Sequence, residues 1–370
     1  MGTSTAVLPS PPQGSAGRGP TLPFRGQTKH RKVRVGIVPY VDGQPGQPLK
    51  IPPVGYIAGL ELKFTGTLNM SSGGALTDKA PWNMFNRVTF SLNLGSANPY
   101  DVSGFGTYAT NYFIERGFAP DKPGVGNANV SAAMYAFPVA SGVNTFVLHL
   151  FIPINMNSDN NFSTGLINLQ AKEIQAYLNI TFGTAVGAAG NNVNTGVGSG
   201  GVTNGQVEVY YHYWDLPANP NVQQPPFVWV RRIEDTLPIT QTGDQTYTFL
   251  RQGSLVNVVH IVTLNGTRSD NIDLLKLIIN DNDLFWTESG TFNKVNNRLR
   301  TGMDLPTGVF CYDLMHANQM MQSGDLRDAI NSEGISQLQS IVTVNSGATL
   351  GSNNSLATIR TLIQALTANS

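Results

Sequence analysis

A strand–helix–strand pattern occurs twice in this chain, and the second copy begins more than a hundred residues after the first. The first copy, over residues 144–183, opens with FVLHLFIPIN and closes with IQAYLNITF, and apolar residues alternate in both segments. Between them Ser163 is placed to cap a short helix that carries Leu166, Ile167 and Leu169. This spacing predicts two strands of one β-sheet with a helix inserted between them.

The second copy has the same order of elements and a clearer helix. It begins with the apolar strand LLKLII and ends with VFCYDLM. After Ser289, the residues Phe292, Val295 and Leu299 recur at helical spacing and share one face. The repetition predicts an all-β fold of two consecutive β-sandwiches, each with a short helix inserted between strands.

Composition supports a large β protein that assembles with other subunits. Only 12% of the 370 residues are charged, about half of the usual share in soluble domains. Glycine (39) and proline (22) are abundant, as the many turns between short strands require. A chain this poor in charge is expected to hide part of its surface against neighbours, although a neutral secreted β protein would have a similar composition.

Changes in composition along the chain predict four segments. Residues 1–32 are rich in Pro, Gly and basic side chains and are expected to form a disordered arm. The first sandwich is expected over residues 33–216 and the second over 227–370. Between them, residues 217–226 contain four prolines and read as a linker.

Two further segments carry expectations of their own. Residues 184–205 contain Gly, Asn, Val and Thr but no charge, and we expect an exposed loop there. At the C-terminus Leu356, Ile359, Ile363 and Leu366 recur at helical spacing after a residue that can cap a helix. This pattern predicts a final amphipathic helix.

The formal net charge of zero conceals a basic N-terminal segment, in which no acidic residue precedes Asp42. Its candidate contact residues lie just before and within the first expected strand: Arg25, Lys29, Arg31, Lys32 and Arg34. They could contact phosphate of nucleic acid or of lipid headgroups on the inner surface of an assembly. The alternatives are a solubilising tail or a clamp on a neighbouring subunit.

No residue pattern indicates catalysis, a metal or a cofactor. His149, His212 and His260 lie in expected strands without a short-spaced partner, so zinc is not expected. The Asp-Asn-Asp segment at residues 281–283 follows a strand and reads as a polar turn. There is no Gly-x-Ser-x-Gly hydrolase motif, and the single cysteine, Cys311, lies in an apolar strand where a buried, inert thiol is expected.

From about residue 53 to residue 346 the chain resembles the double jelly-roll major capsid proteins of tailless icosahedral DNA viruses, in particular the membrane-containing bacteriophages. The segments that carry the resemblance are PVGYIAGLELKFTGTLN, FVLHLFIPIN, LINLQAKEIQAYLNITF, QVEVYYHYWDLPANP and DLPTGVFCYDLMH. The long loop at residues 184–205 and the basic N-terminus depart from the family.

The resemblance implies that the two sandwiches are jelly rolls and that the chain is a structural protein of the virion, made in the host cytoplasm, and not an enzyme. Its partners would be itself, as a homotrimer forming pseudo-hexagonal capsomers of an icosahedral shell, together with neighbouring capsomers, penton or vertex proteins and minor capsid proteins. The basic arm would face an internal membrane or the genome. A double β-sandwich that binds carbohydrate or processes glycans remains the alternative.

Overall fold

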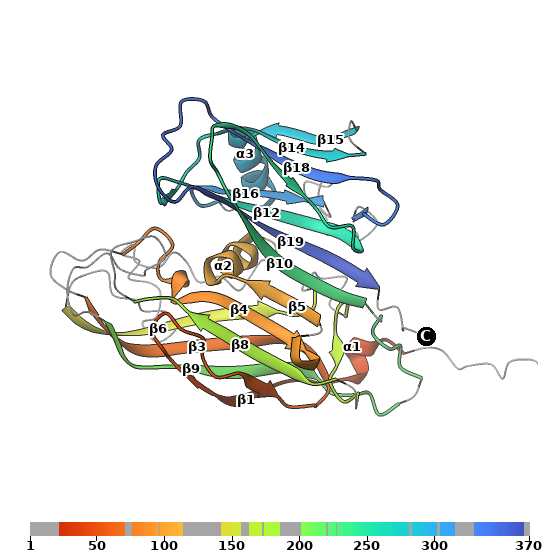
Figure 1. Ribbon diagram of the computed structural model, residues 1–370. Helices are drawn as coiled ribbons and strands as arrows, with labels where there is room; N and C mark the ends of the chain where they lie inside the picture. The colour runs from red at the N-terminus through yellow and green to blue at the C-terminus, as the bar shows by residue number, and fades with distance from the viewer. Residues whose placement is uncertain are drawn as a thin grey trace, which may run out of the picture.

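The protein is described by a computed structural model, and its strands form two β-sandwiches, one above the other in Figure 1. The described residues are 22–70, 76–95, 97–113, 142–156, 163–171, 174–185, 201–219, 221–226, 228–280, 283–301, 304–314 and 329–365. Residues 186–200, which make up most of the expected loop, lie outside the described residues. So do residues 281–282 of the Asp-Asn-Asp segment.

The described part of the first half contains two sheets of four strands each, which are called its long strands below although β2 has only three residues. One sheet has the order β1-β9-β3-β6, and the other contributes the order β5-β4-β8-β2 to a larger sheet. Their bounds are β1 His30–Pro39, β2 Leu49–Ile51, β3 Tyr56–Met70, β4 Phe85–Leu92, β5 Ala97–Val102, β6 Gly142–Pro153, β8 Ala176–Phe182 and β9 Gly201–Trp214; short elements are α1 Phe24–Gln27, η1 Trp82–Met84, η2 Asn93–Gly95 and β7 Ile167–Asn168.

The second half repeats this arrangement. One sheet has the order β10-β19-β12-β16 and the other the order β15-β14-β18-β11. The bounds are β10 Val228–Pro238, β11 Gly243–Thr248, β12 Ser254–Leu264, β14 Ile272–Ile279, β15 Asp283–Ser289, β16 Val309–Asp313, β18 Leu338–Val344 and β19 Ser355–Ala365, with short strands β13 Thr267–Arg268 and β17 Ile330–Asn331.

Both halves have the jelly-roll connectivity. When the long strands of a half are counted in chain order, the first pairs with the last, the last with the third and the third with the sixth. The remaining strands form the facing sheet in the order fifth, fourth, seventh, second in both halves. The prediction of an all-β fold with two consecutive jelly rolls is therefore confirmed.

Among the described residues, each half has one helix between its fifth and sixth long strands. In the second jelly roll this is α3 (Gly290–Thr301), where the sequence predicts it after Ser289. In the first jelly roll it is α2 (Gly104–Phe113), which lies upstream of β6 and not after Ser163. The prediction of one helix per half is confirmed, but its position in the first half was wrong.

The segment after Ser163 is a turn and not a helix, and the backbone of Gly165 shows this. Its φ of +84° lies far from the helical value, and a Cβ at this glycine would lie 2.5 Å from Cγ2 of Val230. Leu166 and Ile167 are buried, but in a turn and the short strand β7. These apolar residues therefore belong to the core, and the prediction that they form a helix is wrong.

The expected C-terminal helix is also wrong, because this segment forms strand β19. β19 is paired on both sides, with β10 and with β12. Leu356 and Leu362 pack into the second core, whereas Ala357 and Ile359 pack against the first. A strand that is buried on both faces has apolar residues at nearly every spacing, so helical spacing occurs in it by coincidence.

The part of the N-terminal arm that the structure describes is ordered, contrary to the expectation of disorder through Lys32. Leu22 forms an isolated bridge with Val222, and Phe24 of α1 is buried against Tyr56 with ring centroids 5.6 Å apart. β1 already begins at His30. Apolar residues in a Pro-rich segment thus anchor it to the residues that connect the two jelly rolls.

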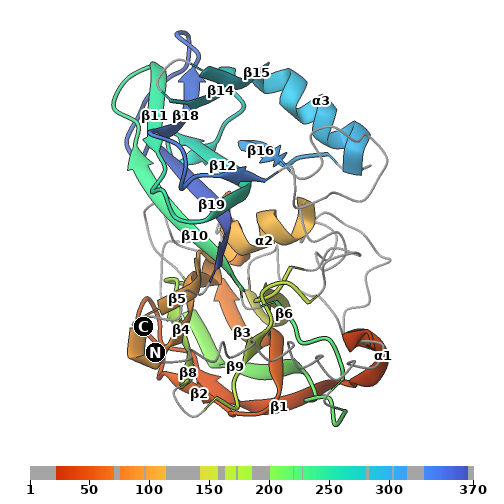
Figure 2. The ribbon, with the colours of Figure 1, turned by 90° about the vertical axis from the view of Figure 1, so that its right-hand side faces the viewer.

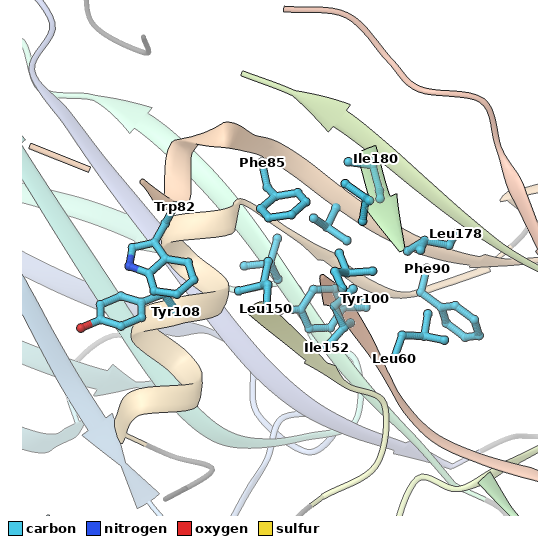
Figure 3. Close-up of a cluster of buried hydrophobic side chains, with 14 of the residues drawn as sticks. Leu60, Trp82, Phe85, Phe90, Tyr100, Tyr108, Leu150, Ile152, Leu178 and Ile180 are labelled. Atoms are coloured by element: carbon cyan, nitrogen blue, oxygen red, sulfur yellow. The ribbon is translucent and has the colours of Figure 1, made fainter. Parts of the chain in front are cut away.

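The first core fills the space between the two sheets of its sandwich and continues to α2. Figure 3 shows this cluster, in which the ring of Trp82 stacks on that of Tyr108 of α2 at 4.6 Å. The core also includes residues from the second half, such as Val259 and Ile359. α2 therefore lies between the two jelly rolls, as Figures 1 and 2 both show.

The two halves also share a sheet. Strand β5 at the edge of the first jelly roll pairs in parallel with β10 of the second through Arg232–Tyr100 and Ile233–Asp101. The buried Arg232 guanidinium donates hydrogen bonds to the carbonyls of Pro153 at 2.8 Å and Asn155 at 3.2 Å. The jelly rolls are thus fixed to each other by backbone pairing, by buried polar contacts and by α2.

Candidate functional site

Three of the five candidate basic residues lie on the edge strand β1 and form ion pairs within the chain. Arg31 pairs with Asp215 at 2.7 Å and Arg34 with Glu208 at 3.4 Å. Lys32 contacts the carboxylate of Glu61, which lies on β3 at the same face of the same sheet. Their charge is therefore largely offset within the chain.

The other two candidates precede β1. The side chain of Lys29 is exposed, and its carbonyl accepts a hydrogen bond from the main-chain N–H of Asp215. Arg25 lies in α1, and its side chain is outside the described residues. Of the four basic residues whose side chains are described, Arg31, Lys32 and Arg34 thus form ion pairs within the chain, and Lys29 is exposed.

Glu61 is the centre of a cluster that the sequence did not predict. It lies on the outer face of the β1-β9-β3-β6 sheet, and its carboxylate is 3.3 Å from Nδ1 of His149 and 3.3 Å from Nε2 of His212. Hydrogen bonds from His149 and His212 hold the pKa of Glu61 well below its usual range, and Lys32 adds to this effect. Strand alternation places each residue on this face, but only the strand register brings them together.

His30 extends this cluster. Its ring stacks on that of His212 with centroids 5.4 Å apart, and burial together with the charge of His212 lowers the pKa of His30. Within the described part of the chain, no group of three or more His, Cys, Asp and Glu side chains could hold a metal ion. The third strand histidine, His260, lies apart in the second core.

A cavity of about 710 Å³ lies between the two jelly rolls, and polar residues contribute much of its lining. Two of its carboxylates already have structural partners: Asp78 binds Arg268, and Glu234 accepts the main-chain N–H of Ser103 at 2.7 Å. Burial lowers the pKa of Lys79, which also lines the cavity.

Helix α3 has its polar side turned inward and its apolar side turned outward. Asn293 and Asn297 are 1% and 3% exposed and hydrogen bond to the carbonyl of Cys311. Phe292, Val295 and Leu299 are 56%, 46% and 63% exposed; these three residues are called the α3 stripe below. The sequence predicts their shared face correctly, and the structure shows that this face is uncovered in the single chain.

The position of α3 at the side of the second jelly roll is clear in Figure 2, where α2 is enclosed between the halves and α3 runs along an edge. A stripe of half-exposed apolar side chains at the surface is typical of a protein–protein contact. In the described residues, no helix is long and apolar enough to span a bilayer.

Comparison with solved structures shows the same fold in viral major capsid proteins. The major capsid protein of Sulfolobus turreted icosahedral virus is similar over 91% of this chain and 97% of its own length, with a TM-score of 0.65 and 14% identity. A PBCV-1 virus capsid structure matches 91% of this chain and 93% of the other chain, with a TM-score of 0.61 and 13% identity.

The major capsid protein P2 of bacteriophage PM2 is similar over 92% of this chain and all of its own, with a TM-score of 0.51 and 10% identity. No protein-family model and no curated protein sequence matches the chain. The resemblance that the sequence indicated is thus confirmed for the fold, and both jelly rolls are covered by it.

Proposed function

We propose that this chain is a major capsid protein, which forms homotrimeric, pseudo-hexagonal capsomers that tile the icosahedral shell of a virion. The observation that carries the proposal is the match of nearly the whole chain to nearly the whole of a major capsid protein, at 91% and 97%. Both jelly rolls and their connection are included in such a match, so the likeness is not that of one common sandwich domain.

The surface supports the same role. A charged fraction of 12% and a helix with an exposed apolar stripe fit a chain that is surrounded by copies of itself. Asp78 and Glu234, the two acidic residues in the lining of the central cavity, have partners within the chain, which fits a structural role. The units of this role are the jelly rolls at residues 33–216 and 227–370, joined through 217–226.

Electron microscopy of the purified chain tests the proposal. Class averages of the particles should show a pseudo-hexagonal outline with threefold symmetry, since a trimer places six jelly rolls around one axis. A compact monomer that binds or cleaves a glycan would support the alternative and contradict the capsid role.

The basic residues have two roles in this proposal. Arg25 and Lys29 face phosphate of the genome or of an internal lipid layer, since they precede the sheet and Lys29 is exposed. Arg31, Lys32 and Arg34 lie on the edge strand β1, with Lys32 and Arg34 on the outer face of the sheet, and take the alternative role of a clamp between subunits. Penton or vertex proteins and minor capsid proteins would bind the completed shell.

Two sets of Gln substitutions separate these roles. The variant R25Q/K29Q should form normal particles that retain less nucleic acid or lipid, whereas R31Q/R34Q should impair particle formation. Equal loss of contents in both variants, with normal particles, would assign phosphate binding to the whole basic segment.

A further inference from the structure

The helices α2 and α3 are equivalent residue by residue, and their first glycines set the register. A Cβ added at Gly104 would lie 2.7 Å from the carbonyl oxygen of Phe85, the first residue of β4. A Cβ added at Gly290 would lie 2.6 Å from the carbonyl oxygen of Ile272, the first residue of β14. Both helices thus start with a glycine that packs against the start of the fourth long strand of its half.

A second contact confirms this register. Asn111 and Asn297 both lie seven residues after the first glycine of their helix. Nδ2 of Asn111 donates to the carbonyl of Phe151 at 2.6 Å, and Nδ2 of Asn297 donates to the carbonyl of Cys311 at 3.2 Å. Phe151 and Cys311 lie on the sixth long strand of their halves and are therefore equivalent.

Strand pairing extends the equivalence across each sheet. Residues directly opposite one another form a row on the outer face of each sheet. The rows are Phe151, Glu61, Tyr210 and Arg34 in the first jelly roll, and Cys311, Val259, Ile359 and Glu234 in the second. Tyr210 therefore occupies the position in the first jelly roll that Ile359 occupies in the second.

Within the chain, the second of these rows covers α2. A Cβ at Gly106 would lie 2.8 Å from Cδ1 of Ile359 and 2.6 Å from Oε2 of Glu234, so these side chains press on the helix. The position in α3 that is equivalent to Gly106 is Phe292, which is 56% exposed. The first jelly roll thus has its helix covered by the second, whereas no described part of the chain covers the α3 stripe.

We propose that the outer face of the β1-β9-β3-β6 sheet of a second copy covers α3, with Tyr210 of that copy on Phe292. This contact rests on the self-assembly proposed above and names the two surfaces that make it. It repeats between chains the contact that the two jelly rolls make within one chain.

The free strand edges fit the same arrangement. Within the chain β10 pairs with the edge strand β5. Their equivalents, β1 and β15, end their sheets and have no second partner strand among the described residues. Both edge strands carry exposed apolar side chains, Leu284 and Phe285 on β15 and Val33 and Ile37 on β1. The proposed contact would bring these two edges toward each other.

The contact between copies differs from the internal one in two respects. Phe292 is larger than Gly106, so the helix lies farther from the covering sheet. Arg34 occupies the position in the first jelly roll that is equivalent to Glu234 in the second. Glu234 accepts a hydrogen bond from the main-chain N–H of Ser103, and an arginine side chain cannot accept one, so this bond is not repeated between copies. The α3 side of the contact is therefore apolar, whereas the covering face also carries the charged side chains of Glu61 and Arg34.

Because the two surfaces differ, the contact is heterologous and head to tail, the kind that closes into a ring. Disulfide formation between two variants with one introduced cysteine each, Phe292→Cys and Tyr210→Cys, tests this directly. The native Cys311 is only 2% exposed and should not compete. Under mild oxidation, a co-assembled mixture of the two variants should form a covalent dimer, and neither variant alone should do so.

A charge-introducing variant gives an independent readout. F292D/V295D should weaken self-association by at least about tenfold while the far-UV spectrum stays unchanged, because both side chains are exposed in the single chain. The control Leu250→Asp replaces an apolar residue that is 59% exposed elsewhere and should assemble as the native chain does.

The outcomes separate this contact from the capsid role. If the native chain assembles but the mixture gives no cross-link, or F292D/V295D assembles normally, the contact is wrong and the capsid role stands. A Phe292→Cys variant that cross-links to itself would show an isologous contact and also overturn it. A native chain that stays monomeric would contradict both.

Discussion

Arg268 of the second jelly roll binds Asp78 of the first through both its side chain and its main chain. Its Nε lies 2.7 Å from Oδ2 of Asp78, and its main-chain N–H donates to the same oxygen at 2.8 Å. The guanidinium also lies over the ring of Phe105 of α2, 4.7 Å from its centroid. One ion pair thus joins both halves and the helix between them.

Substitution Asp78→Asn should lower the free energy of unfolding by about 1–3 kcal/mol, because charged hydrogen bonds to a mostly covered guanidinium are lost. Urea titration measures this loss. The control Asp304→Asn breaks a pair with Arg298 in which both side chains are about two-thirds exposed, and it should change stability little. Equal effects of the two variants would show that the Asp78 pair has no special role.

Substitution Gly290→Ala should destabilise the fold by about 1–3 kcal/mol, because the new methyl group would overlap the carbonyl of Ile272. Gly334→Ala is the control, since a Cβ there meets nothing within 4 Å. Thermal unfolding compares the two. A Gly290→Ala protein as stable as the control would mean that α3 shifts without cost.

The buried His260 should make the protein less stable in acid. Burial lowers its pKa to about 3, and its ring nitrogens lie 2.8 Å from Oγ of Ser340 and 3.0 Å from Oγ1 of Thr358. The unfolded chain binds a proton at this histidine below about pH 6.5, whereas the folded chain does not until about pH 3. The contribution of neutral His260 to the free energy of unfolding is therefore fully present above pH 6.5. Below pH 6.5 this contribution falls by up to about 1.4 kcal/mol per pH unit.

The variant His260→Gln checks this pH dependence. It is expected to be less stable than the native protein at pH 7, but its stability should decline less steeply between about pH 6 and pH 4. Urea unfolding at several pH values gives both slopes. Parallel slopes would show that other groups cause the loss of stability in acid.

Strands with one buried face could be predicted from the sequence. In β3, Leu60, Leu62 and Phe64 alternate with polar residues, and all three are fully buried. α3 could be predicted as well, because Phe292 and Val295 lie at helical spacing after a capping serine. In these segments one period dominates, so the local pattern determines the element.

Elements that depend on contacts distant in the chain could not be predicted. α2 contains Gly104 and Gly106, which disfavour a helix, and it forms because its apolar side chains are covered from both jelly rolls. The Glu61 cluster depends on the register of strands β3, β6 and β9. No residue type or spacing along the chain indicates that His149 and His212 meet at one carboxylate.

Sedimentation of the purified 39.8 kDa chain at about 0.1 M and about 1 M salt is the most direct test of the central claim. A homotrimer should form at both concentrations, because apolar contacts such as those of the α3 stripe are not screened by salt. A folded monomer under both conditions would contradict the capsid role.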